Sequence, residues 1–425
     1  MKWICTTEMQ PWAERTAYVQ NADNQLTLEE AEGHPLLGFG GCFKELGMRA
    51  LLDLKEEERG RVLDLLFDDG HCAFNFCRLS VGANDFAESW YSYNETDGDY
   101  EMQNFSIERD ERLIIPFVRE AQKRRNDLRL FASPWSPPIW MKFPKAHNYG
   151  TLVQTPENLK AYALYFKKYL LAYKDKGIPI QQLHVQNEPM SSQKFPSCVW
   201  TGEEFVRFIS EYLIDAVDGL ADIWIGTING PETDQRALRT RYSQYVGRVM
   251  QDARCRQYVK GASYQWAGKF AMQQTHDDYP ELRLIQSESE CGDGENTWQF
   301  ALYTFEMMRH YFRNGASAYV YWNMALKEGG ESTWGWHQNS LVVVKDGRAQ
   351  VTPEFYLMQH FSHFVRRGAR VLRTSGPWSS NTVAFENPDG TKVAVLMNPY
   401  ETEKTVSVEE KNLLLPPRSF HTVCL

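Results

Sequence analysis

Two stretches that each end in a glutamate are the parts of this sequence best suited to chemistry. Residues 183–189 read Leu-His-Val-Gln-Asn-Glu-Pro and residues 284–288 read Leu-Ile-Gln-Ser-Glu, so Glu188 and Glu288 each follow a short apolar run. Such runs are typical of buried strands in a parallel sheet, whose ends would bring both carboxyl groups to one edge. Hydrolysis of an acetal needs two carboxyl groups, one to protonate the leaving oxygen and one to meet the positive charge on the sugar. The pattern predicts that Glu188 and Glu288 together supply an acid/base and a nucleophile.

Either motif alone also fits a structural role, because a glutamate after a strand often caps a helix or pairs with a lysine. The neighbours of Glu188 favour catalysis. Asn187 can hold a substrate hydroxyl through its amide, and Pro189 stiffens the turn that aims the acid.

A second glutamate, Glu290, follows Glu288 at a distance of two residues. Residues two apart point to the same side of a strand, so periodicity alone does not choose between them. We prefer Glu288 because it ends the apolar run, whereas Glu290 leads into the turn at residues 291–294. A contribution of Glu290 to the site stays open at this point.

The composition is that of a large globular chain. Its 425 residues are 43% hydrophobic and 24% charged, enough for a barrel of roughly 250 residues or more plus an accessory domain. The net charge of −9, without a cluster of Lys and Arg, argues against a nucleic-acid partner. The 13 tryptophans suit either sugar binding or a tryptophan-rich core. The eight cysteines show no zinc-like spacing and are interpreted as mostly buried free thiols.

Nothing in the sequence predicts a membrane span, since no stretch approaches the ~20 apolar residues that one requires. Residues 1–8 contain no apolar segment of the kind found in secretion signals. We therefore expect a cytoplasmic protein if the chain is complete, and a secreted one if a signal has been removed.

Apolar runs alternate with helical periodicity over residues 36–365, which predicts the α/β class and a (β/α)8 TIM barrel. The eight expected strands are residues 38–43, 73–79, 128–133, 182–187, 223–228, 260–264, 283–287 and 318–322. The expected helices are residues 47–67, 110–123, 156–173, 203–218, 236–252, 297–314 and 353–365.

The tail, residues 366–425, changes to a period of two. Its runs at 369–374, 382–386, 392–398 and 403–408 are separated by turn residues, which predicts an appended β-sandwich. Residues 1–35 are expected to add strands to it, with residues 17–19 and 25–28 as the candidates.

Active sites of such barrels lie at the carboxyl ends of the strands, so other side chains at strand ends should line the same pocket. Each of them could equally have a structural role, and Arg78 could be a buried charge partner that keeps the nucleophile ionised. The candidates for substrate binding are Arg78, Asp85, Trp135, Asn187, Gln265, Trp266 and Trp322.

Several of these motifs together resemble glycoside hydrolase family 30, most strongly its glucosylceramidase and β-1,6-glucanase side. The motifs are Gly38-Phe39-Gly40-Gly41, Ala132-Ser133-Pro134-Trp135-Ser136-Pro137-Pro138, Val185-Gln186-Asn187-Glu188-Pro189, Gln286-Ser287-Glu288 and Trp322-Asn323. The resemblance implies a retaining β-glycosidase with a barrel and a β-sandwich, with Glu188 as acid/base and Glu288 as nucleophile.

The same resemblance implies roles around one sugar ring. Asn187 would hold the 2-hydroxyl, Asp85 and Trp135 the far hydroxyls, and Trp322 would form the floor. Two positions depart from the family pattern: Gln265-Trp266-Ala267 stands where a His-Trp-Tyr run is common, and Cys42 where alanine is commoner.

The predicted function is therefore hydrolysis of β-glucosides, as in a glucosylceramidase-like β-glucosidase, without a metal or organic cofactor. The alternatives within the family are a β-1,6-glucanase, a β-xylosidase and a β-fucosidase. A non-catalytic carbohydrate-binding protein is the alternative from another class. A metal-dependent barrel hydrolase needs clustered ligands at strand ends, whereas His184 is interpreted as a satisfied interior residue. The expected partner is a carbohydrate or glycoside.

Overall fold

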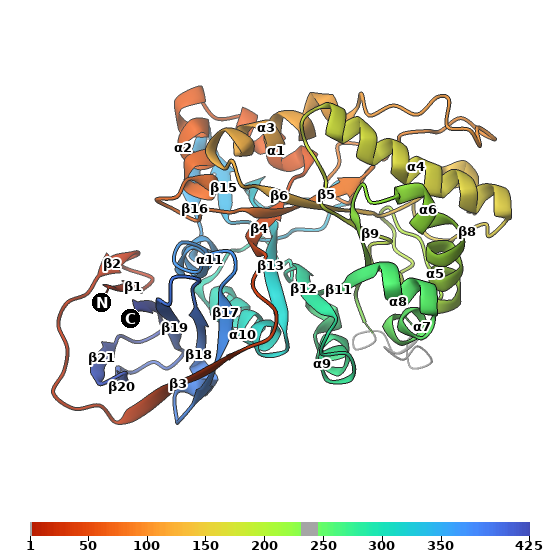
Figure 1. Cartoon of the computed structure of the whole chain (residues 1–425). Coiled ribbons are helices and arrows are strands. Elements are labelled where there is room, and N and C mark those ends of the chain that lie inside the picture. Colours follow the sequence, from red (N-terminus) through yellow and green to blue (C-terminus); the bar gives the residue numbers. More distant parts are fainter. Residues whose placement is uncertain (1, 231–244) are drawn as a thin grey trace.

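The computed structural model describes residues 2–230 and 245–425 and shows a closed barrel beside a β-sandwich (Figure 1). The barrel strands are parallel, and β13 pairs with β4 to close the circle. In chain order they are β4 (Gly38–Cys42), β5 (Phe76–Val81), β6 (Arg129–Pro134), β9 (Gln182–His184), β10 (Asp222–Ile228), β11 (Val259–Gln265), β12 (Arg283–Glu288) and β13 (Ala316–Asn323). The predicted (β/α)8 barrel is confirmed.

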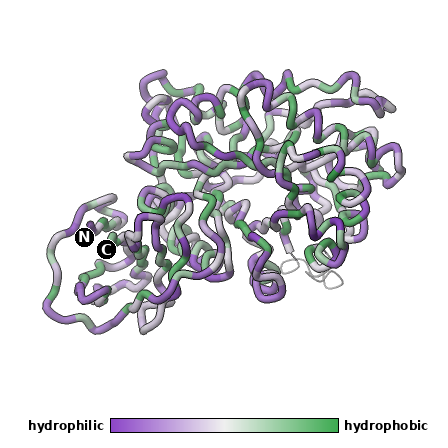
Figure 2. The backbone as a smooth tube through the Cα atoms, viewed as in Figure 1, coloured by the Kyte–Doolittle hydropathy of each residue, from purple (hydrophilic) through white to green (hydrophobic). Residues whose placement is uncertain are grey.

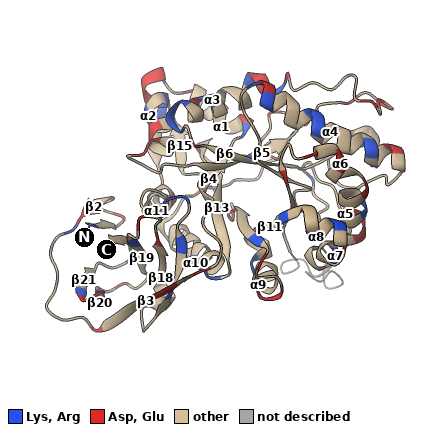
Figure 3. Ribbon diagram, viewed as in Figure 1, with Lys and Arg blue, Asp and Glu red and all other residues tan. Residues whose placement is uncertain are grey.

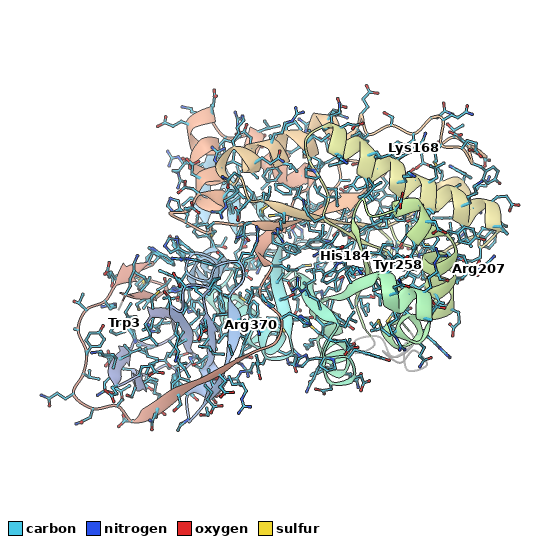
Figure 4. All side chains as sticks on the ribbon, viewed as in Figure 1. Trp3, Lys168, His184, Arg207, Tyr258 and Arg370 are labelled. Atoms are coloured by element: carbon cyan, nitrogen blue, oxygen red, sulfur yellow. The ribbon has the colours of Figure 1, made fainter. Side chains whose placement is uncertain are left out.

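The amino-terminal half of the barrel interior is filled with rings. Phe76, Phe131 and Trp224 belong to one buried cluster. His184 stacks between Phe131 and Trp224, with ring centroids 4.6 and 5.3 Å away, and Figure 4 places it inside the barrel. Its two ring nitrogens hydrogen-bond to Ser263 Oγ at 2.7 Å and Gln182 Oε1 at 3.2 Å, so the interpretation of His184 as a satisfied interior residue is confirmed.

Two glycines explain how β4 fits into the barrel. A Cβ atom on Gly40 would lie 2.0 Å from the carbonyl oxygen of Phe76, and one on Gly41 would lie 2.2 Å from Cγ of Met324. Larger residues are therefore sterically excluded, since such contacts lie well inside van der Waals distance. This close packing brings the end of β4, and Lys44 just after it, next to the other strand ends.

Helices cover the outside of the barrel. Three of them begin at a threonine, Thr155, Thr201 or Thr297, whose side chain accepts a hydrogen bond from the backbone N–H three residues on. The α-helices are α1 (Glu45–Leu52), α2 (Glu56–Phe67), α3 (Ile114–Arg124), α4 (Pro156–Asp175), α5 (Gly202–Phe208), α6 (Ile214–Val217), α7 (Val246–Gln251), α8 (Ala253–Tyr258), α9 (Lys269–Asp278), α10 (Trp298–Arg313) and α11 (Pro353–Ser362). Figure 2 shows hydrophobic and hydrophilic residues alternating along them.

Two predicted helices are interrupted in the structure. The helix expected at residues 47–67 breaks before Lys55, whose backbone is extended. A new helix starts there because Glu56, Glu57 and Glu58 are favourable in a first turn, beside the positive end of the helix dipole. The helix expected at 203–218 contains a π-helical turn at Ile209–Leu213. Most of the helix expected at 236–252 falls on residues 231–244, outside the described residues, and α7 begins after them.

The second domain is a nine-stranded sheet in the order β2-β1-β22-β19-β18-β17-β3-β20-β21. Strand β3 pairs with β17 on one side and with β20 on the other. Apolar side chains from both ends of the sheet, such as Trp3 and Leu413, share one core, so the sheet closes over itself as a sandwich. The strands are β1 (Lys2–Thr6), β2 (Ala13–Glu14), β3 (Asn24–Glu32), β17 (Arg370–Ser375), β18 (Thr382–Glu386), β19 (Lys392–Asn398), β20 (Lys404–Val408), β21 (Lys411–Leu415) and β22 (Ser419–Cys424).

The amino-terminal segment joins this sheet, as expected, but one of its two predicted strands is wrong. Residues 17–19 are not a strand, whereas β1, which was not predicted, pairs with β22 so that Lys2 lies opposite Cys424. The two ends of the chain therefore meet in neighbouring strands (Figure 1).

Loops at the carboxyl ends of the barrel strands carry small sheets. Strands β7 (Lys142–Phe143) and β8 (Thr151–Leu152) form a hairpin after β6. Strands β14 (Ala325–Lys327), β15 (Val342–Lys345) and β16 (Arg348–Val351) follow β13. Lys and Arg are interspersed with Asp and Glu along the helices and loops of the ribbon (Figure 3). No helix among the described residues is long and apolar enough to cross a membrane.

Candidate active site

A pocket of about 120 Å³ lies at the carboxyl ends of the barrel strands. Seven of the nine residues predicted from the sequence line it: Asp85, Trp135, Asn187, Glu188, Gln265, Trp266 and Glu288. The other two, Arg78 and Trp322, are at most 1% exposed and lie against these residues. The pocket lining also includes Ser191, Gln193, Phe195, Asn229, Ala267, Cys291, Trp336 and Gln338, which the sequence had not indicated.

Glu288 is the last residue of β12 and is held by an arginine. Arg78 Nη1, from β5, donates to Glu288 Oε2 at 2.6 Å. Both side chains are almost completely buried, so this ion pair is little screened by water. These contacts match the alternative considered for Arg78, a charge partner that favours the carboxylate form of Glu288.

The same guanidinium orients Asn187. Arg78 Nη2 donates to Asn187 Oδ1 at 2.7 Å, and the Thr227 hydroxyl donates to the same oxygen, also at 2.7 Å. The guanidinium lies 4.5 Å from the ring centroid of Trp135. With its oxygen occupied twice, the Asn187 amide can offer its N–H groups to a hydroxyl in the pocket.

Glu188 occupies a tight turn after β9. Its φ of 47° is in the left-handed region, and its backbone N–H donates to the carbonyl of Thr227 at 2.9 Å. Backbone strain of this kind in a non-glycine residue is common at active sites. Gln265 Nε2 donates to Glu188 Oε1 at 2.8 Å, while Oε2 is buried and has no hydrogen-bond partner among the described residues. One carboxyl oxygen is therefore left for a substrate.

The two glutamates lie in different electrostatic surroundings. Burial, and then the charge of Glu288, raise the pKa of Glu188 to about 8. Burial also raises the pKa of Glu288, but Arg78 and Lys44 oppose that rise. Since Glu288 has a cation in direct contact and Glu188 accepts from a neutral amide, Glu288 is the more readily ionised of the two. A proton shared by the pair resides on Glu188.

Lys44 was not predicted from the sequence. Its Nζ lies 3.1 Å from the ring centroid of Trp322 and 4.5 Å from that of Phe86, and it donates to Asn323 Oδ1. Burial lowers the pKa of Lys44 to about 7, and burial raises that of Asp85 to about 7. Each charge stabilises the other, so the two groups titrate as a pair. The signal in the sequence was a lysine directly after the glycine-rich first strand.

Trp322 stacks on Trp135, with the ring centroids 5.5 Å apart. The Lys44 cation therefore faces a ring that packs against the pocket lining. Glu290 does not line the pocket; the hydroxyl of Tyr303 donates to it. No cluster of three or more His, Cys, Asp or Glu that could hold a metal ion occurs within residues 2–230 and 245–425.

Replacing Lys44 by methionine should shift the pH profile of the site rather than merely lower its activity. Lys44 lowers the pKa values of Asp85 and Glu288, so without it both carboxyl groups would ionise at higher pH. The acid limb of kcat/KM should move up by on the order of one pH unit. An equal loss of kcat/KM at every pH, with no shift of the acid limb, would indicate that Lys44 has a purely structural role. The Lys44→Arg variant, which keeps the cation, is the control.

Comparison with known proteins gives consistent matches over the whole chain. Residues 36–365 match the profile described as "Glycosyl hydrolase family 30 TIM-barrel domain", and residues 368–423 match the "Glycosyl hydrolase family 30 beta sandwich domain". The lysosomal acid glucosylceramidase of Mus musculus is 27% identical over 431 residues, covering 93% of this chain and 82% of the mouse protein. An endo-1,6-β-D-glucanase of Trichoderma harzianum is 26% identical over 396 residues, covering 86% and 78%.

Among solved structures, SrfJ from Salmonella typhimurium has the same fold. It is 25% identical, with a TM-score of 0.87 and coverage of 100% of this chain and 99% of SrfJ. The match spans the barrel and the sandwich together.

Proposed function

The chain belongs to glycosyl hydrolase family 30, and on that premise we propose that it hydrolyses β-glucosides with retention of configuration, through Glu288 as nucleophile and Glu188 as acid/base. The observation that carries this proposal is the contrast between two glutamates in one pocket, one paired with a buried arginine and the other with a raised pKa. Paired carboxyl groups whose pKa values are pushed apart are the arrangement expected of an acid and a nucleophile.

In the first step, the Glu288 carboxylate attacks the anomeric carbon while Glu188 gives its proton to the departing glycosidic oxygen. This forms a covalent glucosyl-enzyme and leaves Glu188 ionised. In the second step, Glu188 takes a proton from water as the water oxygen attacks the same carbon, and the Glu288 carboxylate is released. Arg78 neutralises Glu288 whenever it is ionised, and Asn187, held by Arg78, is placed to donate to a sugar hydroxyl.

The glycone is proposed to be glucose because the names of two curated relatives, a glucosylceramidase and an endo-1,6-β-D-glucanase, both specify glucose. They differ in what is attached to it, a lipid in one and a glucan in the other. A β-xylosidase or β-fucosidase remains an alternative to be decided by the same assay.

The test is hydrolysis of aryl β-glucosides, β-xylosides, β-fucosides and β-galactosides, followed by proton NMR of the sugar before mutarotation. We expect β-glucose as the first product. Initial release of the α-anomer would contradict the two-step mechanism, and release of another sugar alone would contradict the choice of glucose. The absence of turnover on every glycoside would overturn the proposal.

The pH dependence of kcat/KM at alkaline pH follows from the protonation of Glu188. Its pKa of about 8 lies above the usual value of a glutamate, so the proton is mostly bound at neutral pH and is lost as the pH rises through 8. We expect kcat/KM on an alkyl β-glucoside to fall about tenfold per pH unit above that point. A profile that instead falls through about pH 5, the ordinary range of a glutamate, would contradict this acid.

A further inference from the structure

An aromatic wall borders the pocket on the side of the loop between β14 and β15. It consists of Phe195, Trp334 and Trp336, and we call these three residues the aromatic wall. The rings of Phe195 and Trp334 lie 5.5 Å apart, and those of Trp334 and Trp336 meet edge to face at 5.2 Å. Trp336 is 41% exposed although it lines the pocket, so it offers ring surface at the pocket mouth.

The loop that carries Trp334 and Trp336 is held by hydrogen bonds within itself and to the loop after β5. Ser332 N–H donates to the carbonyl of Trp336 at 2.8 Å, and Trp336 N–H donates to Ser332 Oγ at 3.0 Å. Thr333 N–H donates to the carbonyl of Asp85 at 3.1 Å. Lys194 Nζ lies 5.1 Å from the ring centroid of Trp334. Trp336 is therefore positioned before any ligand arrives, which reduces the entropy lost on binding.

Polar groups also line the pocket. Ser191, Gln193 and Asn229 belong to the lining, and Asn229 Nδ2 donates to Ser191 Oγ. Asn229 Oδ1 is buried and accepts no hydrogen bond from any described residue, and the same is true of Glu188 Oε2 and Asp85 Oδ1. A buried acceptor without a donor is costly, so Asn229 Oδ1, and Asp85 Oδ1 when that carboxyl is ionised, call for a donor such as a ligand hydroxyl, whereas protonated Glu188 can donate from Oε2 to the glycosidic oxygen.

We propose that the aromatic wall and Asn229 form a subsite for a second sugar ring, so that the substrate is a β-linked gluco-oligosaccharide. This inference rests on the proposed function, since it places the leaving group of that reaction. A pyranose has an apolar face that can lie on the indole of Trp336, and its hydroxyls can donate to Asn229. A hydrocarbon chain could cover the ring of Trp336 but would leave the Asn229 oxygen unpaired.

The test compares two substrates with the same glycone. In β-glucosyl fluoride the leaving group is a single atom, whereas β-linked glucobioses place a second ring at the mouth. For Trp336→Ala we expect the ratio of kcat/KM on the glucobiose to kcat/KM on the fluoride to fall about tenfold or more. Trp336→Phe, which keeps an aromatic face, should restore much of the ratio. The matched control is Tyr258→Ala, an equally exposed aromatic (43%) that directly precedes β11 and so lies at the amino ends of the barrel strands, which should leave the ratio unchanged.

Two kinetic outcomes would overturn the subsite. These are an unchanged ratio in Trp336→Ala, whether or not both rates fall together, and cleavage by the wild type of a glucosylated lipid in mixed micelles with no cleavage of any glucobiose. Failure of the wild type on β-glucosyl fluoride would instead count against the proposed function. A binding measurement separates failure of the subsite from failure of the proposed function, because calorimetric titration of Glu288→Gln with a glucobiose requires no turnover. We expect Glu288→Gln to bind the disaccharide and the Glu288→Gln/Trp336→Ala double variant to bind it about tenfold more weakly; equal binding would also overturn the subsite.

Discussion

Glu288→Gln should abolish turnover of β-glucosides, with a loss in kcat on the order of 10⁴-fold or more. The amide is nearly isosteric and can still accept from Arg78, but it cannot attack the anomeric carbon. The matched control is Glu290→Gln, which changes the neighbouring glutamate, bonded to Tyr303 and outside the pocket lining. It should retain activity close to the wild type, so the pair also decides which of the two glutamates acts.

The measurement is kcat on an aryl β-glucoside, with melting temperatures to show that each variant is folded. A second variant, Glu288→Ala, makes space for a small anion where the carboxylate stood. Added azide should then attack the opposite face of the sugar and give the α-glucosyl azide. Full activity of Glu288→Gln together with loss in Glu290→Gln would reverse the assignment of the nucleophile.

The barrel could be predicted from the sequence because its strands are buried on both faces. Each is a short apolar run bounded by polar or turn residues, and such a run allows few alternatives. Strand β9 shows the limit, since only Gln182–His184 is a regular strand where residues 182–187 were expected. The chain turns early there, and Glu188 reaches the pocket from a strained turn with positive φ.

The sandwich was harder to predict at its edges. Strand β1 is identified by its pairing with β22, more than 400 residues away along the chain, rather than by a local pattern. Residues 17–19, Ala-Tyr-Val, were a candidate strand but form no strand pairing; Val19 N–H makes a single bond to the carbonyl of Asn412. Strand propensity therefore depends on the partner more than on the residues themselves.

The residues of the site also differ in whether they could be predicted from the sequence. Residues at or directly after strand ends, such as Trp135 and Glu288, could be located because the barrel fixes where strand ends meet. Lys44 and Trp336 could not be located from a motif. Lys44 is identified as a site residue by the contact of its ammonium group with the ring of Trp322. Trp336 lies on a long loop whose conformation depends on contacts with Asp85 and Ser332. Loop geometry of this kind is set by tertiary contacts, which a single sequence does not show.

Glu188→Gln should affect two classes of substrate differently. With an alkyl β-glucoside, whose leaving group needs a proton, kcat/KM should fall by about 10² to 10⁴-fold. With 2,4-dinitrophenyl β-glucoside, which departs without a proton, the first step should remain fast. The second step then lacks its base, so the glucosyl-enzyme should accumulate after a burst of dinitrophenolate.

Mass spectrometry of the intact protein should show the added glucosyl group on Glu188→Gln and not on Glu288→Gln. Azide needs no general base, so it should restore turnover and yield the β-glucosyl azide, the opposite anomer to that expected from Glu288→Ala.

The matched control is Glu354→Gln: Glu354 is also fully buried, with its pKa raised to about 7, but it is bonded to Thr304 and Asn339 outside the pocket lining. If Glu188→Gln loses both substrates equally, without a burst and without rescue, the residue does not act as the acid/base. Burial, and to a lesser extent Asp293, raise the pKa of Glu354 as well, so a raised pKa does not by itself identify the acid, and this comparison tests whether a place in the same pocket as Glu288 does.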